Sequence, residues 1–287
     1  MIALHFPRLC EWMPSASTWM RLLSFDPLRS LGVPGARPVK PTDWFRRRAE
    51  ILESDWLLFP EYWQVNALVY AWKKRIFPSV STYHLGHDKV QMTRAFEAAC
   101  PQHVPLTLIL PATERSAEEV LDTLSFPFVA KEVRSSMGQG VHRIDSRSDF
   151  KRYAAANEVL YVQEYLPIRR DLRVVWVGDQ VLSAYWRQAP PGGFHNNVSR
   201  GGAVSFEEIP ENALELVQRV ATALGIDHAG FDIAVVEGHG YLLEFNLLFG
   251  TQALNSRGIA IGPVILDYIR RQAAPPWSPD HTLPRAS

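Results

Sequence analysis

The sequence predicts a mixed α+β or α/β protein with roughly two lobes, and three observations support this fold class. The 287 residues are 47% hydrophobic and 21% charged, an ordinary globular composition with enough apolar residues for a sizeable core. Short apolar runs typical of strands alternate with segments whose apolar residues recur at helical spacing. Two pairs of apolar runs, around Gly178-Asp179 and around Gly238-His239-Gly240, indicate β-hairpins.

Charge and composition argue against several classes of function. The 30 basic and 30 acidic residues cancel, so there is no net positive field to hold nucleic acid or an anionic membrane. No stretch approaches the ~20 apolar residues of a membrane span, and residues 1–8 do not resemble a secretory signal. Cys10 and Cys100 fit no metal-binding or disulfide spacing. We therefore expect a cytoplasmic protein without nucleic-acid or membrane partners.

The first predicted unit, residues 1–86, is a short N-terminal α/β unit. Residues 1–45 contain many prolines and show no regular period, so they are expected to be irregular. Six of the nine tryptophans fall in the first 72 residues, which suggests aromatic packing against the rest of the chain or a second subunit. After them we expect a helix from Asp43, a strand over 55–59 and a helix over 62–75.

The second predicted unit, residues 87–166, begins with a helix that runs to about Cys100. A strand over 106–110 follows, and the residue types from Ser116 onward are those of a capping box that opens a helix. Strands are expected over 126–133 and 159–165, separated by a loop of small residues.

The third predicted unit, residues 167–272, contains both hairpins. Its strands are expected over 171–177, 181–187, 229–236 and 241–247, with a long loop over 189–202. An amphipathic helix over 211–224 is closed by Gly225, and a last helix covers about 263–271. The tail, residues 273–287, is rich in proline and is predicted to be disordered.

The second hairpin carries two carboxylates and an amide on one face. Asp232 alternates with apolar residues on the first strand, as Glu244 and Asn246 do on the second. Such hard oxygen ligands suit magnesium that bridges nucleotide phosphates. We expect Asp232 opposite Glu244 only if the loop has an odd length, because an even loop would pair Asp232 with Phe245. The alternative is an ordinary hairpin with solvated outward residues.

A lysine and a loop of small residues suggest a phosphate site. Lys131 lies inside an apolar strand, where its charge is costly unless it meets an anion. The loop that follows contains Ser136, Gly138 and Gly140, and small residues let backbone N–H groups approach phosphate oxygens. It matches neither a Walker A loop nor a Rossmann fingerprint. Lys89 is a second candidate; the alternatives are a flexible turn and an exposed helix-start lysine.

The remaining candidates are a strand edge and a group of arginines. The strand ending at Glu164 could read an adenine rim through its backbone, with Glu164 accepting from the amino group. A three-residue turn, Gly178-Asp179-Gln180, would bring Arg187 opposite Asp171. Arginines and asparagines suit a phosphate and a tetrahedral adduct, although ion pairs and turn chemistry are alternatives. The full set is Asp171, Arg173, Arg187, Asn196, Asn197 and Arg200.

Taken in order, these residues resemble the ATP-grasp superfamily and, within it, the RimK-like group. The resemblance runs from about residue 88 to about residue 251. Its pieces are Asp88-Lys89, Lys131 with its Gly loop, Gln163-Glu164-Tyr165-Leu166, Asp171-Leu172-Arg173, Asn197 to Gly202, Gly230-Phe231-Asp232 and Glu244-Phe245-Asn246.

The resemblance implies ATP held between two α+β lobes, behind an N-terminal pre-ATP-grasp unit. By implication, Lys89 and Lys131 contact phosphates. The adenine is held by Glu164, Tyr165 and Leu166, the ribose is approached by Asp171, and two magnesium or manganese ions are bound by Asp232, Glu244 and Asn246. The transferring phosphate is held by Arg200 and Arg173, and Asn197 helps to place ATP or substrate.

The sequence departs from the family pattern at two places. Asn246 is followed by Leu247-Leu248-Phe249-Gly250 instead of a Ser-Pro-Gly-like turn, and this loop borders the acceptor in relatives. The N-terminal unit is short and rich in proline. Both departures leave the acceptor open.

The predicted function is an ATP-dependent ligase that joins a carboxylate to an amine through an acyl-phosphate. The carboxylate would come from an amino acid or a peptide, with glutamate one candidate. The alternatives are a small-molecule kinase on the same fold and a nucleotide-binding regulatory protein. The family and the aromatic-rich N-terminus also favour a homo-oligomer.

Overall fold

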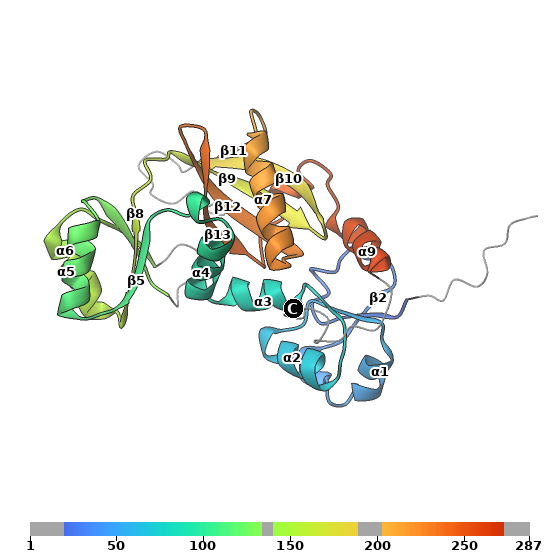
Figure 1. Cartoon of the computed structure of the whole chain (residues 1–287). Coiled ribbons are helices and arrows are strands. Elements are labelled where there is room, and N and C mark those ends of the chain that lie inside the picture. The colour runs from blue at the N-terminus through green and yellow to red at the C-terminus, as the bar shows by residue number, and fades with distance from the viewer. Residues whose placement is uncertain (1–19, 134–139, 189–202, 273–287) are drawn as a thin grey trace, which may run out of the picture.

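The computed structural model describes residues 20–133, 140–188 and 203–272, which form three sheets (Figure 1). One four-stranded sheet, flanked by α5 and α6, lies at the left of the view. The five-stranded sheet lies in the middle, and the N-terminal unit with α1 and α2 lies below it. The three sheets follow one another in sequence, so the chain builds the molecule unit by unit.

The N-terminal unit contains a parallel sheet of very short strands. Their order is β2-β1-β3-β4, and all three neighbouring pairs are parallel. Residues 20–45 were expected to be irregular, but they contain the first two strands. Strands of three residues between prolines and glycines are too short to show a period. The strands are β1 (Leu22–Ser24), β2 (Ala36–Pro38), β3 (Trp56–Leu58) and β4 (Ile76–Phe77).

Helices complete this unit and lead into the next. The predicted helix over 62–75 forms as an α-helix that passes into a π-helical segment at Ala67–Ala71. The helix expected from Asp43 forms in two parts. A 3-10 turn covers Pro41–Asp43, and the regular α-helix, α1, begins only at Arg48. No helix was expected over α3, whose sequence lacks a clear apolar face. The helices are α1 (Arg48–Glu53), α2 (Tyr62–Asn66) and α3 (Val80–His87).

The second sheet is antiparallel, in the order β5-β8-β6-β7, and packs against α5 and α6. The cap of α5 is Thr113, whose hydroxyl accepts from Ser116 N at 3.2 Å, so the capping box expected at Ser116 was wrong. The strand β7 and the helix α6 were not expected. The elements are β5 (Thr107–Pro111), α5 (Glu114–Thr123), β6 (Phe128–Lys131), β7 (Val141–Ile144), α6 (Arg147–Ala156) and β8 (Val159–Glu164).

The largest sheet is antiparallel, in the order β11-β10-β9-β12-β13. Both predicted hairpins are present, as are the helix over 211–224 with its left-handed Gly225 cap (φ 66°) and the last helix. The strands are β9 (Arg170–Val177), β10 (Gln180–Gln188), β11 (Ala203–Ser205), β12 (His228–Val236) and β13 (His239–Asn246). The helices are α7 (Glu211–Leu224), α8 (Gln252–Asn255) and α9 (Ile261–Arg271).

Each hairpin obtains its register from a β-bulge and not from the length of its turn. In the second hairpin Val236 pairs with His239 around a two-residue turn, and the register shifts before Asp232 pairs with Glu244. The first hairpin also has a two-residue turn, with a shift between Val181 and Ser183. The expected odd loops were therefore wrong, although both expected pairings form. A two-residue turn alone would offset the expected pairing by one residue, and the extra residue in each bulge restores that pairing.

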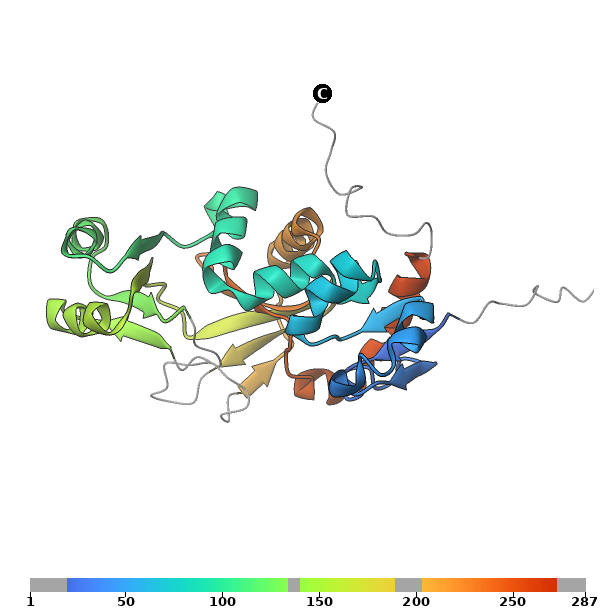
Figure 2. The ribbon, with the colours of Figure 1, turned by 90° about the horizontal axis from the view of Figure 1, so that it is seen from below.

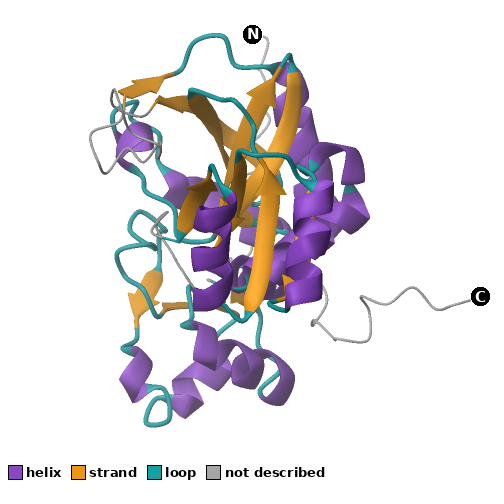
Figure 3. Cartoon of the chain, turned by 90° about the vertical axis from the view of Figure 1, so that its left-hand side faces the viewer, coloured by secondary structure: helices purple, strands orange, loops and turns teal. Residues whose placement is uncertain are grey.

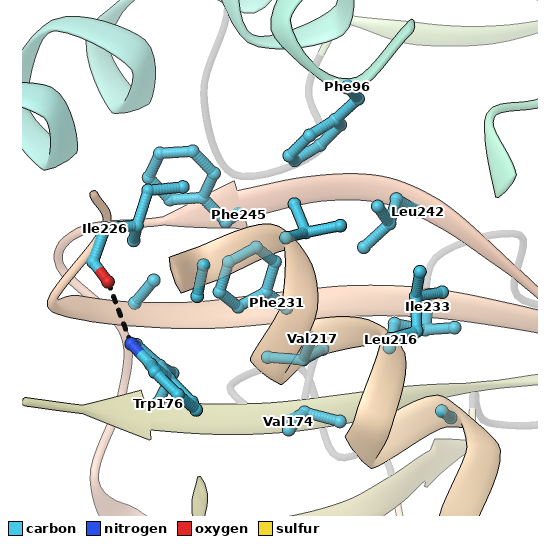
Figure 4. Close-up of a cluster of buried hydrophobic side chains, with 14 of the residues drawn as sticks. Phe96, Val174, Trp176, Leu216, Val217, Ile226, Phe231, Ile233, Leu242 and Phe245 are labelled. Atoms are coloured by element: carbon cyan, nitrogen blue, oxygen red, sulfur yellow. Dashed lines mark hydrogen bonds between the residues drawn. The ribbon is translucent and has the colours of Figure 1, made fainter. Parts of the chain in front are cut away.

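Helices cover one face of the large sheet. Side chains of α4 (Lys89–Ala99) and α7 pack there against Phe231, Phe245 and Trp176 (Figure 4). The Trp176 indole N–H donates to Ile226 O at 2.8 Å, which satisfies its one polar atom. Figure 2 shows α3, α4 and α7 on the same side of the strands. The predicted division had placed α4 with residues 87–166, yet its apolar side packs on the large sheet.

The opposite face of the large sheet is divided into two parts. Near Val175 and Val177, α9 and strands β1 and β3 cover it with an apolar cluster. Beyond this cluster the same face carries charged side chains. Figure 3 shows the twisted strands with helices packed alongside. Within the described part of the chain, no helix is both long and apolar enough to cross a membrane.

Candidate functional site

Four residues form one row across the charged part of the large sheet. The register pairs Tyr185 with Arg173, Arg173 with Asp232, and Asp232 with Glu244 on four successive strands. Paired residues in neighbouring strands present their side chains to the same face. We call Tyr185, Arg173, Asp232 and Glu244 the site row.

Two buried arginines connect two buried aspartates in this region. Arg173 donates to both Asp232 oxygens, at 2.5 and 3.1 Å. Arg187 lies 2.9 Å from Asp232 and also donates to both Asp171 oxygens, at 2.7 and 2.9 Å. None of the four residues is more than 8% exposed. The ion-pair alternative for Arg173 and Arg187 is therefore present, and Asp171, expected beside the ribose, holds Arg187.

The arginines and burial act differently on the two aspartates. Burial acts to raise the pKa of Asp232, but the two guanidiniums outweigh it and hold that pKa below its ordinary value. Burial, with the charge of Asp232 beside it, raises the pKa of Asp171 to about 6. Asp232 is therefore the more firmly ionised of the pair.

Asn246 lies beside Glu244 at the end of β13. Its amide nitrogen donates to Glu244 Oε1 at 3.3 Å, and Glu244 in turn stands opposite Asp232. Within residues 20–133, 140–188 and 203–272, no three His, Cys, Asp or Glu side chains are placed to hold a metal ion. The predicted set contains only two such residues, with an amide oxygen as the third donor.

Two lysines lie close to Glu244. Lys131, on β6, is 8% exposed, and its ammonium lies 5.5 Å from the ring centre of Tyr161. Burial lowers its pKa, while Glu244 and Asp232 act to raise it. Lys89, the first residue of α4, donates to Glu132 O at 3.4 Å. Burial also lowers the pKa of Lys89, against the opposing effect of Glu244. The lysines of the predicted phosphate site therefore lie at the Glu244 end of the site row.

Part of the predicted phosphate and substrate set cannot be placed. Gly140 is described, and its carbonyl accepts from Glu132 N at 2.7 Å, next to the strand that carries Lys131. The other predicted residues of the two loops lie outside the described residues. They are Ser136, Gly138, Asn196, Asn197 and Arg200.

The predicted adenine segment forms the end of β8. Glu164 Oε1 accepts from Leu106 N at 2.7 Å, so one oxygen of this expected adenine acceptor is bound to the backbone beside β5. The Arg143 guanidinium lies over the Tyr165 ring, 4.9 Å from the centre of that ring. Leu166 is half-buried, and its carbonyl accepts from Ile168 N at 2.8 Å.

Sequence reasoning missed two residues of the site. Gly230 gives Arg173 its room, since a Cβ there would lie 2.7 Å from Arg173 Nη1 and 2.9 Å from Phe249 Cβ. Its place two residues before Asp232, on the same face, was the available signal. Tyr185 was not singled out in the sequence, and it packs in the apolar cluster with Val175 and Val177 as well as standing in the site row.

Comparison with known proteins gives a consistent result. The sequence model of the RimK-like ATP-grasp domain matches residues 88–269. The chain is 30% identical over 216 residues to the "Probable alpha-L-glutamate ligase" of Enterobacter sp. strain 638, covering 70% of this chain and 72% of that one. It is also 30% identical over 179 residues to the ribosomal protein bS6–L-glutamate ligase of Escherichia fergusonii, covering 60% of each.

Solved structures show the same fold. An ATP-grasp RimK domain protein from Sphaerobacter thermophilus aligns with a TM-score of 0.61 at 16% identity, over 75% of this chain and 81% of that one. The D-alanine–D-alanine ligase of Bacillus anthracis aligns with a TM-score of 0.62 at 17% identity, over 83% and 86%.

Proposed function

The chain belongs to the RimK-like ATP-grasp family of ATP-dependent carboxylate–amine ligases, and on this premise we propose that it joins an amino acid and a peptide or second amino acid. The relatives are named for glutamate, so glutamate is the first amino acid to test. The observation that carries the proposal is the site row, which ends at Glu244 beside two lysines.

The nucleotide is proposed to lie at the lysine end of the row. Lys89 and Lys131 would meet its phosphates, which would offset the cost of their burial. The adenine would lie along Glu164, Tyr165 and Leu166, where β8 ends. The loop residues Ser136, Gly138 and Gly140 would contribute backbone N–H groups, and Asn196 and Asn197 would help to place ATP or substrate.

The donor set fits magnesium. Asp232, Glu244 and Asn246 offer hard oxygens on one face of the hairpin. A carboxylate has about four lone-pair sites, and the hydrogen bonds from Arg173 occupy two of those on Asp232, so acceptor capacity remains for a metal ion even with Arg187 2.9 Å away. When bound, two magnesium ions would neutralise phosphate charge.

The proposed reaction has two steps. A substrate carboxylate oxygen forms a bond to the γ-phosphorus of ATP while the bond to the β-phosphate oxygen breaks, which gives an acyl-phosphate and ADP. An amine nitrogen then bonds to the acyl carbon, phosphate leaves, and the amine loses a proton. Arg173, Arg187 and Arg200 would stabilise the negative charge on the transferring group. Asp171 and Asp232 would hold Arg187 in position.

An ADP-release assay tests this function. Purified protein with Mg²⁺ and ATP is screened against amino acids, singly and in pairs, with L-glutamate in the first set. We expect ADP release that depends on both a carboxylate and an amine. In Glu244→Ala, release should fall about 100-fold, a typical loss for one charge-stabilising group. The exposed Glu215 on α7 gives the matched control, because α7 packs on the face of the sheet opposite the site row.

The screen also separates the alternatives. A stable phosphorylated product without any amine would indicate a kinase instead. Undiminished turnover in Glu244→Ala would refute the metal assignment, and ATP binding without ADP release from any pair would contradict the ligase reaction.

A further inference from the structure

A group of aromatic side chains reaches the surface of the N-terminal unit. Trp44 is buried and belongs to the core of that unit. Three rings pack around it, with ring centres 4.6 Å away for Phe45, 4.8 Å for Trp72 and 5.2 Å for Trp63. Phe45 is nevertheless 70% exposed and Trp63 is 53% exposed. We call Trp44, Phe45, Trp63 and Trp72 the aromatic patch.

The exposed rings of the patch are held in place by their neighbours. Phe45 contacts the rings of both Trp44 and Trp72, and the Trp63 indole N–H donates to Glu61. Side chains fixed in this way lose little conformational freedom when a partner binds. Large exposed hydrophobic side chains that gather in one place are typical of interaction sites, where tryptophan and phenylalanine are enriched.

Cations border the aromatic patch. The Arg48 guanidinium lies 5.7 Å from the Trp72 ring centre, and Lys73 follows Trp72 directly. Both cations are exposed, and neither makes an ion pair with another described residue. Arg48 is also the first residue of α1, where a positive charge opposes the helix dipole, so the helix itself does not favour it there. Carboxylates of a partner would complement both charges.

We propose that the aromatic patch binds an acidic, proline-containing segment of a partner protein in an extended conformation. Proline-rich segments dock on aromatic surfaces, and they lose little entropy because they are already extended. The carboxylates of the segment lie against Arg48 and Lys73. Asp43, next to Trp44, and Glu61 also border the patch, which favours a narrow segment over a continuous anionic surface such as a membrane.

Fluorescence anisotropy of labelled peptides tests the patch without any nucleotide. The full chain is titrated against three fluorescein-labelled peptides, in which Glu-Pro-Pro, Lys-Pro-Pro or Glu-Gly-Gly is repeated four times. We expect saturable binding of the Glu-Pro-Pro peptide with a Kd below about 1 mM, and binding at least about 10-fold weaker for the other two. The lysine peptide removes the charge match, and the glycine peptide removes the proline rings.

Variants assign the binding to the patch. Phe45→Ala should weaken binding of the Glu-Pro-Pro peptide at least about 5-fold, a typical effect of truncating an aromatic anchor, with an unchanged melting temperature because Phe45 is mostly exposed. Arg48→Glu should weaken the same binding and narrow the difference between the glutamate and lysine peptides. The controls are Leu106→Ala, an exposed hydrophobic residue beside the second sheet, and Arg115→Glu, an exposed arginine in the first turn of α5.

The results separate a peptide partner from other occupants of the patch. Equal binding of the three peptides, no saturable binding, or unchanged binding in Phe45→Ala would overturn the proposal. Binding to vesicles of phosphatidylserine and phosphatidylcholine that is lost in Phe45→Ala would assign the patch to a membrane surface. A dimer in sedimentation that dissociates in Phe45→Ala would assign it to a second copy of this chain. ADP release enters none of these measurements, so the proposed function stands or falls separately.

Discussion

Asp232 accepts two hydrogen bonds from Arg173 and forms an ion pair with Arg187, so removing one arginine leaves a buried charge only partly compensated. The sequence placed Asp232, Glu244 and Asn246 on one face because they alternate with apolar residues. It could not show which arginine meets which aspartate, since ion pairing depends on register across β9, β10 and β12.

Arg173→Met should lower the free energy of unfolding by roughly 3–5 kcal/mol, because breaking a buried ion pair leaves its partner uncompensated. Chemical denaturation measures this loss. Arg21→Met is the matched control: Arg21 pairs with Glu53 at the surface, where such pairs contribute about 0–1 kcal/mol. Equal losses in the two variants would contradict a special role for the buried pair.

Gly230→Ala should displace Arg173, because the new Cβ would lie 2.7 Å from Arg173 Nη1. Overpacking of this kind typically costs about 1–3 kcal/mol, and ADP release should fall with it. Gly240→Ala is the control on the neighbouring strand, where a Cβ would make ordinary contacts at 3.5 Å. If Gly230→Ala kept full stability and turnover, Arg173 would not need the space.

At the scale of elements, the strands of the large sheet were predictable and the bulges were not. Leu242 and Leu243 are both apolar, so the sequence gives no sign that the register shifts between them. The helix α6 was missed because only Phe150 and Tyr153 among its residues are buried and large. The strands of the N-terminal sheet have two or three residues, too few for alternation to be visible.

Asp227 joins two elements, and its charge should make the fold sensitive to pH. Its Oδ1 accepts from Ser79 N at 2.7 Å and from the Thr82 hydroxyl at 3.1 Å, which ties the start of α3 to β12. Burial raises the pKa of Asp227 to about 7, although these hydrogen bonds act to lower it. A carboxyl group whose pKa is raised by folding stabilises the fold below its unfolded pKa of about 4. That contribution is lost as the pH rises through about 7.

Asp227→Asn should remove this dependence while keeping an oxygen acceptor for Ser79. Between pH 5 and pH 7 the natural protein should lose stability relative to the variant by about 1.4 kcal/mol per pH unit. Urea unfolding of both proteins at several pH values measures the difference. Parallel stability curves for the two proteins would show that Asp227 does not titrate in this range.

At the scale of the whole molecule, the N-terminal unit and the large sheet share one apolar cluster. Leu22 and Leu58 of the first sheet pack in the same cluster as Val175 and Val177 of β9 and Ile265 of α9. The three units predicted from the sequence follow one another along the chain, but the sequence could not show that two of them are held together by a common core.

Leu58→Ala should therefore destabilise the large sheet together with the N-terminal unit. Leu58 is fully buried, and such a truncation costs about 2–5 kcal/mol. We expect a single unfolding transition, followed by near-ultraviolet circular dichroism, that shifts as a whole. A variant in which only an early, partial transition moved would contradict the shared core.

The packing of α9 against both sheets also limits how the fold can be recombined. A chimera that replaced residues 1–86 with the leading segment of a relative would leave Val175, Val177 and Ile265 facing foreign side chains. A transplant would have to carry α9 along with the first sheet, although 183 positions of sequence lie between the end of β4 at Phe77 and the start of α9 at Ile261.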